Sequence, residues 1–150
     1  MLDERTEFCD ATSLNTGGAA SYLLGDQIDL GAAVRDVGTG HDLFLVLQVD
    51  TTCTSGGSAT AAFHLVSDAA AAIAVDGTAT YHFSTSAIPV ATLVAGYVIA
   101  IVQLPQGRNY ERYLGILQTT AVAAFTAGKI NAFLTPDPAN WRAYDAPNQA

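Results

Sequence analysis

The chain has 150 residues, of which half are hydrophobic and only 13% are charged, and its formal net charge is −8 at pH 7. This length suits one domain with a substantial core. The acidic balance argues against nucleic acid and anionic membrane surfaces as partners, because both are bound through clustered lysine and arginine. With so few charged residues, the surface must consist largely of small and hydroxyl-bearing residues or be covered by partners.

Nearly all the predicted elements are strands, and they belong to one domain over residues 1–150. Residues 1–40 are expected to form an N-terminal arm and the first strands, and the proline-containing residues 135–150 an extended C-terminal tail. Between them, segments rich in β-branched and aromatic residues alternate with turns rich in Gly, Ser and Thr. This spacing is typical of an all-β sandwich or barrel. The predicted strands are 43–49, 59–66, 78–84, 97–104, 110–119 and 129–135.

Two segments allow more than one interpretation. Residues 67–75, SDAAAAIAV, combine a serine that can cap a helix with strong helix formers, and predict either one turn of helix or an irregular loop. Residues 88–104, IPVATLVAGYVIAIVQL, are apolar over the length of a short membrane span. Because Pro89 and Gly96 interrupt them, a loop followed by a buried strand is the better interpretation.

Three of the predicted strands, 43–49, 97–104 and 110–119, carry aliphatic residues on both faces. In an antiparallel sandwich one face of a strand packs inward and the other normally meets water. The outer faces of these strands must therefore be covered. Either the protein's own arms cover them, or another chain does.

Side chains that could carry catalysis or bind a metal are few and dispersed. His64 and His82 would share an outward face if their strands are neighbours, but two histidines alone make a poor zinc site. Asp26 and Asp29 form a carboxylate pair, yet nothing in the sequence places them opposite the acidic cluster of Asp3, Glu4, Glu7 and Asp10. There is no nucleophile-elbow, P-loop or dinucleotide-binding pattern. We therefore expect no enzymatic activity, metal, cofactor or small-molecule substrate.

Six segments along the chain resemble a group of tailed-phage structural proteins. In chain order they are LDERTEFCDATSLNTG (2–17), YLLGDQIDLG (22–31), LFLVLQVDT (43–51), YERYLGI (110–116), FTAGKINAFL (125–134) and TPDP (135–138). Together they resemble the capsid cement, or decoration, proteins of short-tailed double-stranded DNA phages of the Bordetella-phage type. The resemblance runs essentially from end to end, and it lies in the order of many segments rather than in one diagnostic motif.

The resemblance implies a jelly-roll-like antiparallel β-sandwich with extended N- and C-terminal arms. It also implies a virion protein on the outer capsid surface, which binds the major capsid protein, stabilises contacts between its copies and forms a homodimer. It brings no catalytic residues. Two other classes stay open: a glycan- or host-surface-binding module of the virion, and a small enzyme with a pocket at Asp26, Asp29 or the histidines.

Candidate contact residues follow from the expected arms and from the start of one strand. Apolar and aromatic side chains in the arms could anchor a partner, since Trp and Tyr are favoured at interfaces. Glu111 and Arg112 begin a strand and could form an ion pair with a neighbouring molecule. The candidates are Leu2, Phe8, Leu14, Tyr110, Glu111, Arg112, Trp141 and Tyr144.

Overall fold

The computed structural model describes residues 4–35, 37 and 40–138, and within them nearly all regular structure is β-strand. No helix of this part of the chain is long and apolar enough to cross a membrane. All six predicted strands are present, several of them longer than expected. The elements are η1 (Glu4–Thr6), β1 (Glu7–Ser13), β2 (Ala20–Arg35), β3 (Phe44–Ser55), β4 (Thr60–Asp68), β5 (Thr80–Ser84), β6 (Ile88–Pro89), η2 (Val90–Thr92), β7 (Val98–Gln103), β8 (Tyr110–Ala121) and β9 (Phe125–Thr135).

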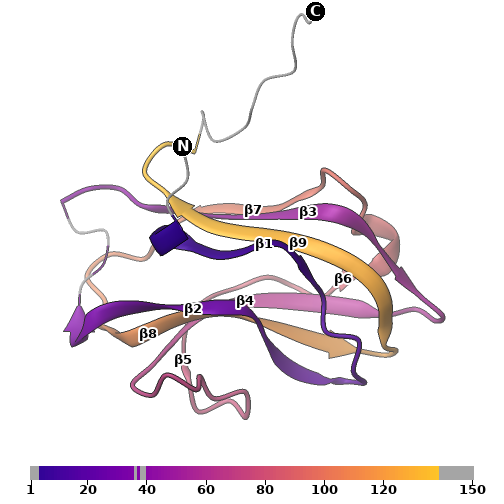
Figure 1. Ribbon diagram of the computed structural model, residues 1–150, viewed down its shortest axis with the longest axis horizontal. Helices are drawn as coiled ribbons and strands as arrows, with labels where there is room; N and C mark the ends of the chain where they lie inside the picture. Colours follow the sequence, from indigo (N-terminus) through magenta and orange to yellow (C-terminus); the bar gives the residue numbers. More distant parts are fainter. Residues whose placement is uncertain (1–3, 36, 38–39, 139–150) are drawn as a thin grey trace, which may run out of the picture.

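The strands form two antiparallel sheets that pack face to face (Figure 1). One sheet, here called sheet A, has the order β1-β9-β3-β7, and the other, sheet B, has the order β2-β8-β4-β5, with β6 also paired to β4. The chain passes from one sheet to the other between β1 and β2, β2 and β3, β3 and β4, β6 and β7, β7 and β8, and β8 and β9. This connectivity is that of a jelly roll. The predicted all-β sandwich is confirmed.

The expected N-terminal arm is in large part a pair of strands. β1 and β2 are the end strands of sheets A and B, paired with β9 and β8 respectively. Each therefore takes part in the sandwich rather than lying over it. The reason is long-range pairing, which no local pattern of residues 1–40 reveals. Most of the expected C-terminal tail, from residue 139 on, lies outside the described residues.

The main core fills the space between the two sheets. Along β3, Leu45 and Leu47 point into it, whereas Val46 between them takes the opposite face because successive side chains of a strand alternate. Val46 pairs with Phe133, and both are buried although they belong to neither core cluster. The largest fully buried side chains are Tyr110, Phe8, Phe63, Phe125, Leu24, Leu45, Leu47, Leu65, Leu93, Leu104, Leu114 and Ile116.

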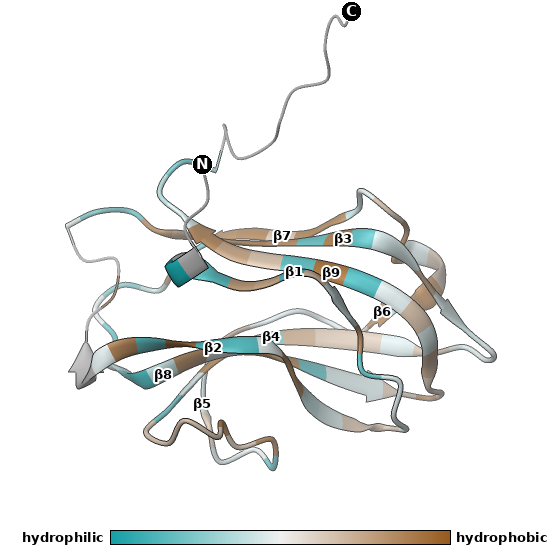
Figure 2. Cartoon of the chain, viewed as in Figure 1, coloured by the Kyte–Doolittle hydropathy of each residue, from teal (hydrophilic) through white to brown (hydrophobic). Residues whose placement is uncertain are grey.

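A second, smaller core lies on the outer face of sheet B and explains why β4 and β8 are apolar on both faces. Residues 69–79, which join β4 to β5, run along that face and place Ile73 against Val66 and Leu117. Ile73 sits over Gly115, where any β-carbon would collide with its side chain. Figure 2 shows the hydrophobic colouring of this connection beside β5. An internal loop, rather than either of the expected arms, therefore covers this part of the face.

The same loop decides between the two interpretations of residues 67–75. Asp68 accepts hydrogen bonds from the amides of Ala70 and Ala74, one on each carboxylate oxygen and both 2.9 Å long. An aspartate that binds the backbone in this way favours a turn over a helix. The irregular loop is confirmed and the helical turn is wrong, because burial of Ile73 and the bonds to Asp68 outweigh the helix propensity of alanine.

Candidate functional site

A groove runs between the end strands of the two sheets. β1 and β2 lie one above the other on the same side of the sandwich (Figure 1), and the groove between them has a volume of about 740 Å³. The buried residues Phe8 and Cys9 line it from β1, and Ile28 lines it from β2. Its volume falls within the range of roughly 300–1,000 Å³ that is usual for binding pockets. Half of the residues that line it are charged.

The groove owes its shape to an irregular stretch of β2. The pairing of β2 with β8 shifts between Leu24 and Ile28, so residues 25–27 bulge out of the regular ladder. Gly25 has a φ of 72°, and a β-carbon there would collide with the carbonyl of Phe8 and lie 2.6 Å from Cβ of Cys9. Only glycine permits this close approach at low cost. Gly25 thus brings the two strands together, and the bulge directs the next residues toward the groove.

Carboxylates line both sides of the groove. Glu7 and Asp10 come from β1, Asp26 comes from the bulge of β2 and Asp29 from the paired stretch just after it, and Arg5 lies at the same site. The two acidic groups that looked unrelated in the sequence therefore face one hollow. Asp3 and the side chain of Glu4, the other members of the acidic cluster, lie outside the described residues. The described residues contain no group of three or more His, Cys, Asp or Glu that could hold a metal ion.

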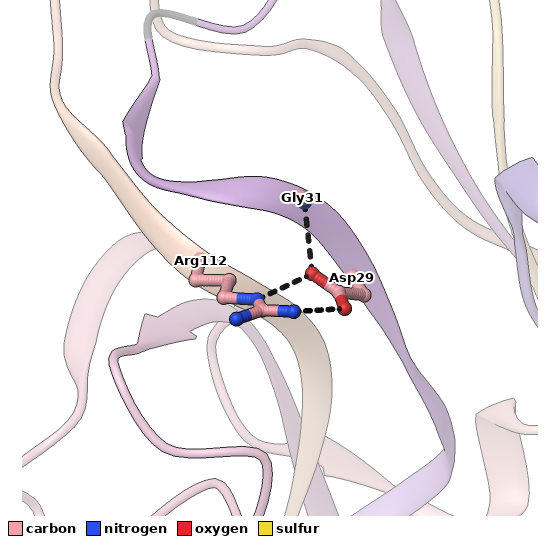
Figure 3. A network of polar contacts seen from close by, with 3 residues as sticks. All are labelled: Asp29, Gly31 and Arg112. Carbon is pink, nitrogen blue, oxygen red and sulfur yellow. Dashed lines mark hydrogen bonds and ion pairs between the residues drawn. The ribbon is translucent and has the colours of Figure 1, made fainter.

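Asp29 is held by an ion pair within the chain, shown in Figure 3. Its two carboxylate oxygens accept hydrogen bonds from Nε and Nη2 of Arg112, both 2.9 Å long, and Oδ1 also accepts the amide of Gly31 at 2.8 Å. These bonds, first of all those from Arg112, lower the pKa of Asp29 to about 2. An ionised, occupied carboxylate cannot serve as a general acid near neutral pH. Arg112, expected to pair with a neighbouring molecule, instead joins β8 to β2 of its own chain.

The two histidines lie on opposite faces of sheet B, which corrects the expectation that they share one. β4 and β5 are neighbours as expected, but the register shifts between the pairs Leu65–Phe83 and Val66–Tyr81, so His82 is the extra residue of a β-bulge. His64 faces outward, with its ring nitrogens 2.8 Å from the hydroxyl of Ser84 and 3.1 Å from that of Thr119. The bulge turns His82 inward, and sequence alternation alone does not reveal it.

His82 makes a close contact with a serine that sequence reasoning missed. Its Nε2 lies 2.8 Å from Oγ of Ser67, and its ring lies 4.2 Å from the ring of Tyr110. Ser67 also accepts the amide hydrogen of Glu111 at 3.1 Å, so its hydroxyl contacts both β8 and the histidine. Ser67 is fully buried, so its hydroxyl is not accessible to a substrate. The pair fastens β4, β5 and β8 together, and desolvation lowers the pKa of His82.

The other candidate contact residues have varied positions. Phe8, Leu14 and Tyr110 are buried in the main core, so their side chains offer no surface to a partner. They look like anchors in the sequence because core strands and interface arms use the same residue types. Glu111 is half-buried and accepts a long hydrogen bond, 3.4 Å, from Thr80. Leu2, Trp141 and Tyr144 lie outside the described residues.

Cys9 and Cys53 are free thiols. Both are buried, and desolvation raises the pKa of Cys9 to about 12 and that of Cys53 to about 11. The thiolate is the reactive form, so these cysteines are poor nucleophiles at neutral pH. Their role in the fold is to fill space on the inner side of sheet A.

Comparison with protein families places the chain beside one phage protein family. The model of the family described as Bbp16 matches residues 10–134, which include most of β1 and all of the strands from β2 through β8, and nearly all of β9. No curated protein matches the chain. The matched range covers most of the sandwich, including β2, but it begins at residue 10, so Glu7, Phe8 and Cys9 of the groove lie outside it.

Proposed function

Because the chain belongs to the Bbp16 family, we propose that it is a capsid cement protein, which binds the outer surface of a phage shell and stabilises contacts between copies of the major capsid protein. The family's name suggests a protein of a Bordetella phage. The observation that carries the proposal is the length of the family match, since residues 10–134 contain nearly the whole jelly roll. The end-to-end resemblance to cement proteins supplies the specific role.

The charge of the molecule supports a position outside the shell. The formal net charge is −8, and the four carboxylates around the groove contribute to it on one side of the sandwich. Packaged DNA repels such a surface, because nucleic acid is bound through cationic side chains. On the outside of the shell this repulsion is absent.

The proposed mechanism is the addition of many modest interfaces. A protein that binds the assembled shell and not its separated subunits stabilises the assembly by mass action. If one cement unit contacts two capsid subunits, its second contact forms at a high effective concentration, and the two contacts together bind far more tightly than either does alone. A homodimer, the association state that we propose, would double the number of such contacts for each unit.

The experiment is to bind the purified chain to mature shells that lack it. We expect the chain to co-sediment with the shells and to raise the temperature at which they release DNA or break apart, and its mass in solution to be that of a dimer. A heat-denatured sample of the chain is the control for trapping of aggregates. A chain that stays in the supernatant and leaves the disruption temperature unchanged would refute the cement function.

A second candidate function is glycan or host-surface binding, and one observation favours it. Tyr81 is 40% exposed on the outer face of sheet B, with the ring of His64 edge-on at 5.1 Å. Beside them, hydroxyls of Ser84, Thr119 and Ser21 form a row of hydrogen bonds across the sheet. An exposed aromatic ring next to hydroxyl groups can stack on a sugar. Binding of the chain to a glycan array, lost in Tyr81→Ala, would favour this function over cementing.

A further inference from the structure

The groove between β1 and β2 is bordered by two strands that each end a sheet. In the described part of the chain, β1 pairs with β9 and β2 pairs with β8, and neither has a strand on its other side. The outer edge of an end strand presents backbone N–H and C=O groups that can pair with an added strand. β1 has 7 residues, so a partner segment of similar length could lie along it.

The groove is hollow rather than filled by side chains because of the β2 bulge. Gly25 sets the closest approach of the two strands at Phe8 and Cys9, and residues 25–27 of β2 stand outside its ladder with β8. Half-buried Ile28 therefore gives the base of the groove its apolar surface, beside the buried Phe8 and Cys9, and exposed polar residues lie at its rim. An apolar base and a polar rim are the usual anatomy of a site that binds a peptide segment.

The charges select the kind of segment. Negative charge outweighs positive charge around the groove. The carboxylates belong to Glu7, Asp10, Asp26 and Asp29. The guanidinium groups are those of Arg5 and of Arg112, and Arg112 is paired with Asp29. The side chains of Asp10 and Asp26 are exposed on opposite walls. A segment with lysine or arginine side chains spaced along it would meet carboxylates on both sides, whereas an acidic segment would be repelled.

We propose that this groove receives an extended segment of the major capsid protein that carries lysine or arginine. The inference rests on the proposed cement function for the identity of the partner, and it names the surface of the chain that meets the shell. The segment adds alongside β1 or β2 as an extra strand, with its cationic side chains between Asp10 and Asp26. Binding through this groove weakens as ionic strength rises, because the charges at its rim are exposed to solvent.

The first test uses shells that lack the chain and compares Asp26→Lys with Asp50→Lys. Asp50 is also exposed and ends the apolar part of β3, away from the groove, so the two variants have the same net charge. We expect Asp26→Lys to weaken co-sedimentation with shells at least about fivefold, and Asp50→Lys to stay within about twofold of the original chain. Equal thermal unfolding of the two variants shows that the fold is intact.

The second test does not depend on the shell. The isotopically labelled chain is titrated with a synthetic peptide of about eight alternating lysine and threonine residues, long enough to span β1, and followed by its amide resonances. We expect shifts confined to residues 7–12 and 26–29, abolished by Asp26→Lys and kept in Asp50→Lys. Shifts spread over the whole acidic surface, or equal loss in the two variants, would overturn the assignment to the groove.

The outcomes separate the groove from the cement function. If the original chain binds shells and Asp26→Lys binds them equally well, the groove is not the contact surface and cementing still stands. If the chain ignores shells, the cement function falls and with it the capsid protein as the partner. In that case shifts at the groove in the peptide titration would establish only a cationic-peptide site.

Discussion

The loop that covers the outer face of sheet B makes a sharp stability prediction. Ile73→Ala removes most of a side chain that is only 6% exposed and that packs over Gly115 against Leu117. The change deletes about three methylene equivalents, worth about 0.8 kcal/mol each. The cavity left by the missing side chain lowers the stability further. This added loss is smaller than in a central strand, because a loop can collapse into the space more easily. We expect the free energy of unfolding to fall by about 2–3 kcal/mol.

The assay is equilibrium unfolding in urea, followed by circular dichroism. The matched control is Val75→Ala, two residues along the same loop, where the side chain is 44% exposed and absent from the small core. We expect its effect to stay below about 0.5 kcal/mol. Equal effects of the two substitutions, or a loss below about 1 kcal/mol for Ile73→Ala, would refute the idea that this loop is a packed cover of sheet B.

Three further predictions concern β2 and the titrating groups. Gly25→Ala should lower the free energy of unfolding by at least about 2 kcal/mol, because the φ of Gly25 is 72° and a β-carbon there would collide with Phe8. The control is Gly31→Ala, since Gly31 has a similar φ of 77° but open space around it. In the same urea assay, Gly31→Ala should lower the free energy of unfolding by less than Gly25→Ala does. The folded pKa of His82 is lowered from 6.5 by burial, so its contribution to stability is present above pH 6.5 and is lost as the pH falls below 6.5. His82→Gln should therefore make the urea midpoint depend less on pH between about 7 and 5. An unchanged dependence of the midpoint on pH would contradict this prediction. The folded pKa of Asp29 is lowered from 3.8 to about 2, so its contribution persists above pH 3.8 and is lost as the pH falls toward 2; carbon-detected NMR titration of the carboxyl should show a midpoint near 2 that rises toward 3.8 in Arg112→Gln.

The sequence by itself determined the fold class, because the signals for it are local. Apolar residues in short segments between turns at Gly, Ser and Thr place β4, β5, β7 and β8 within about two residues of their positions, whereas β3 continues through Ser55 and β9 begins at Phe125, both beyond the predicted ends. The resemblance supplied the jelly-roll connectivity. The apolar character of β8 on both faces also showed correctly that something must cover sheet B.

Only the tertiary structure decided what covers that face and where the charges meet. Ile73 reaches Gly115, Arg112 reaches Asp29, and Glu7 and Asp10 come to share a groove with Asp26 and Asp29. Each of these contacts depends on the register of strands that are far apart in the chain, and one extra residue, as at His82, turns a side chain to the other face. Periodicity reports which residues alternate within a strand, but it holds no information on which strands become neighbours or where a bulge shifts their pairing.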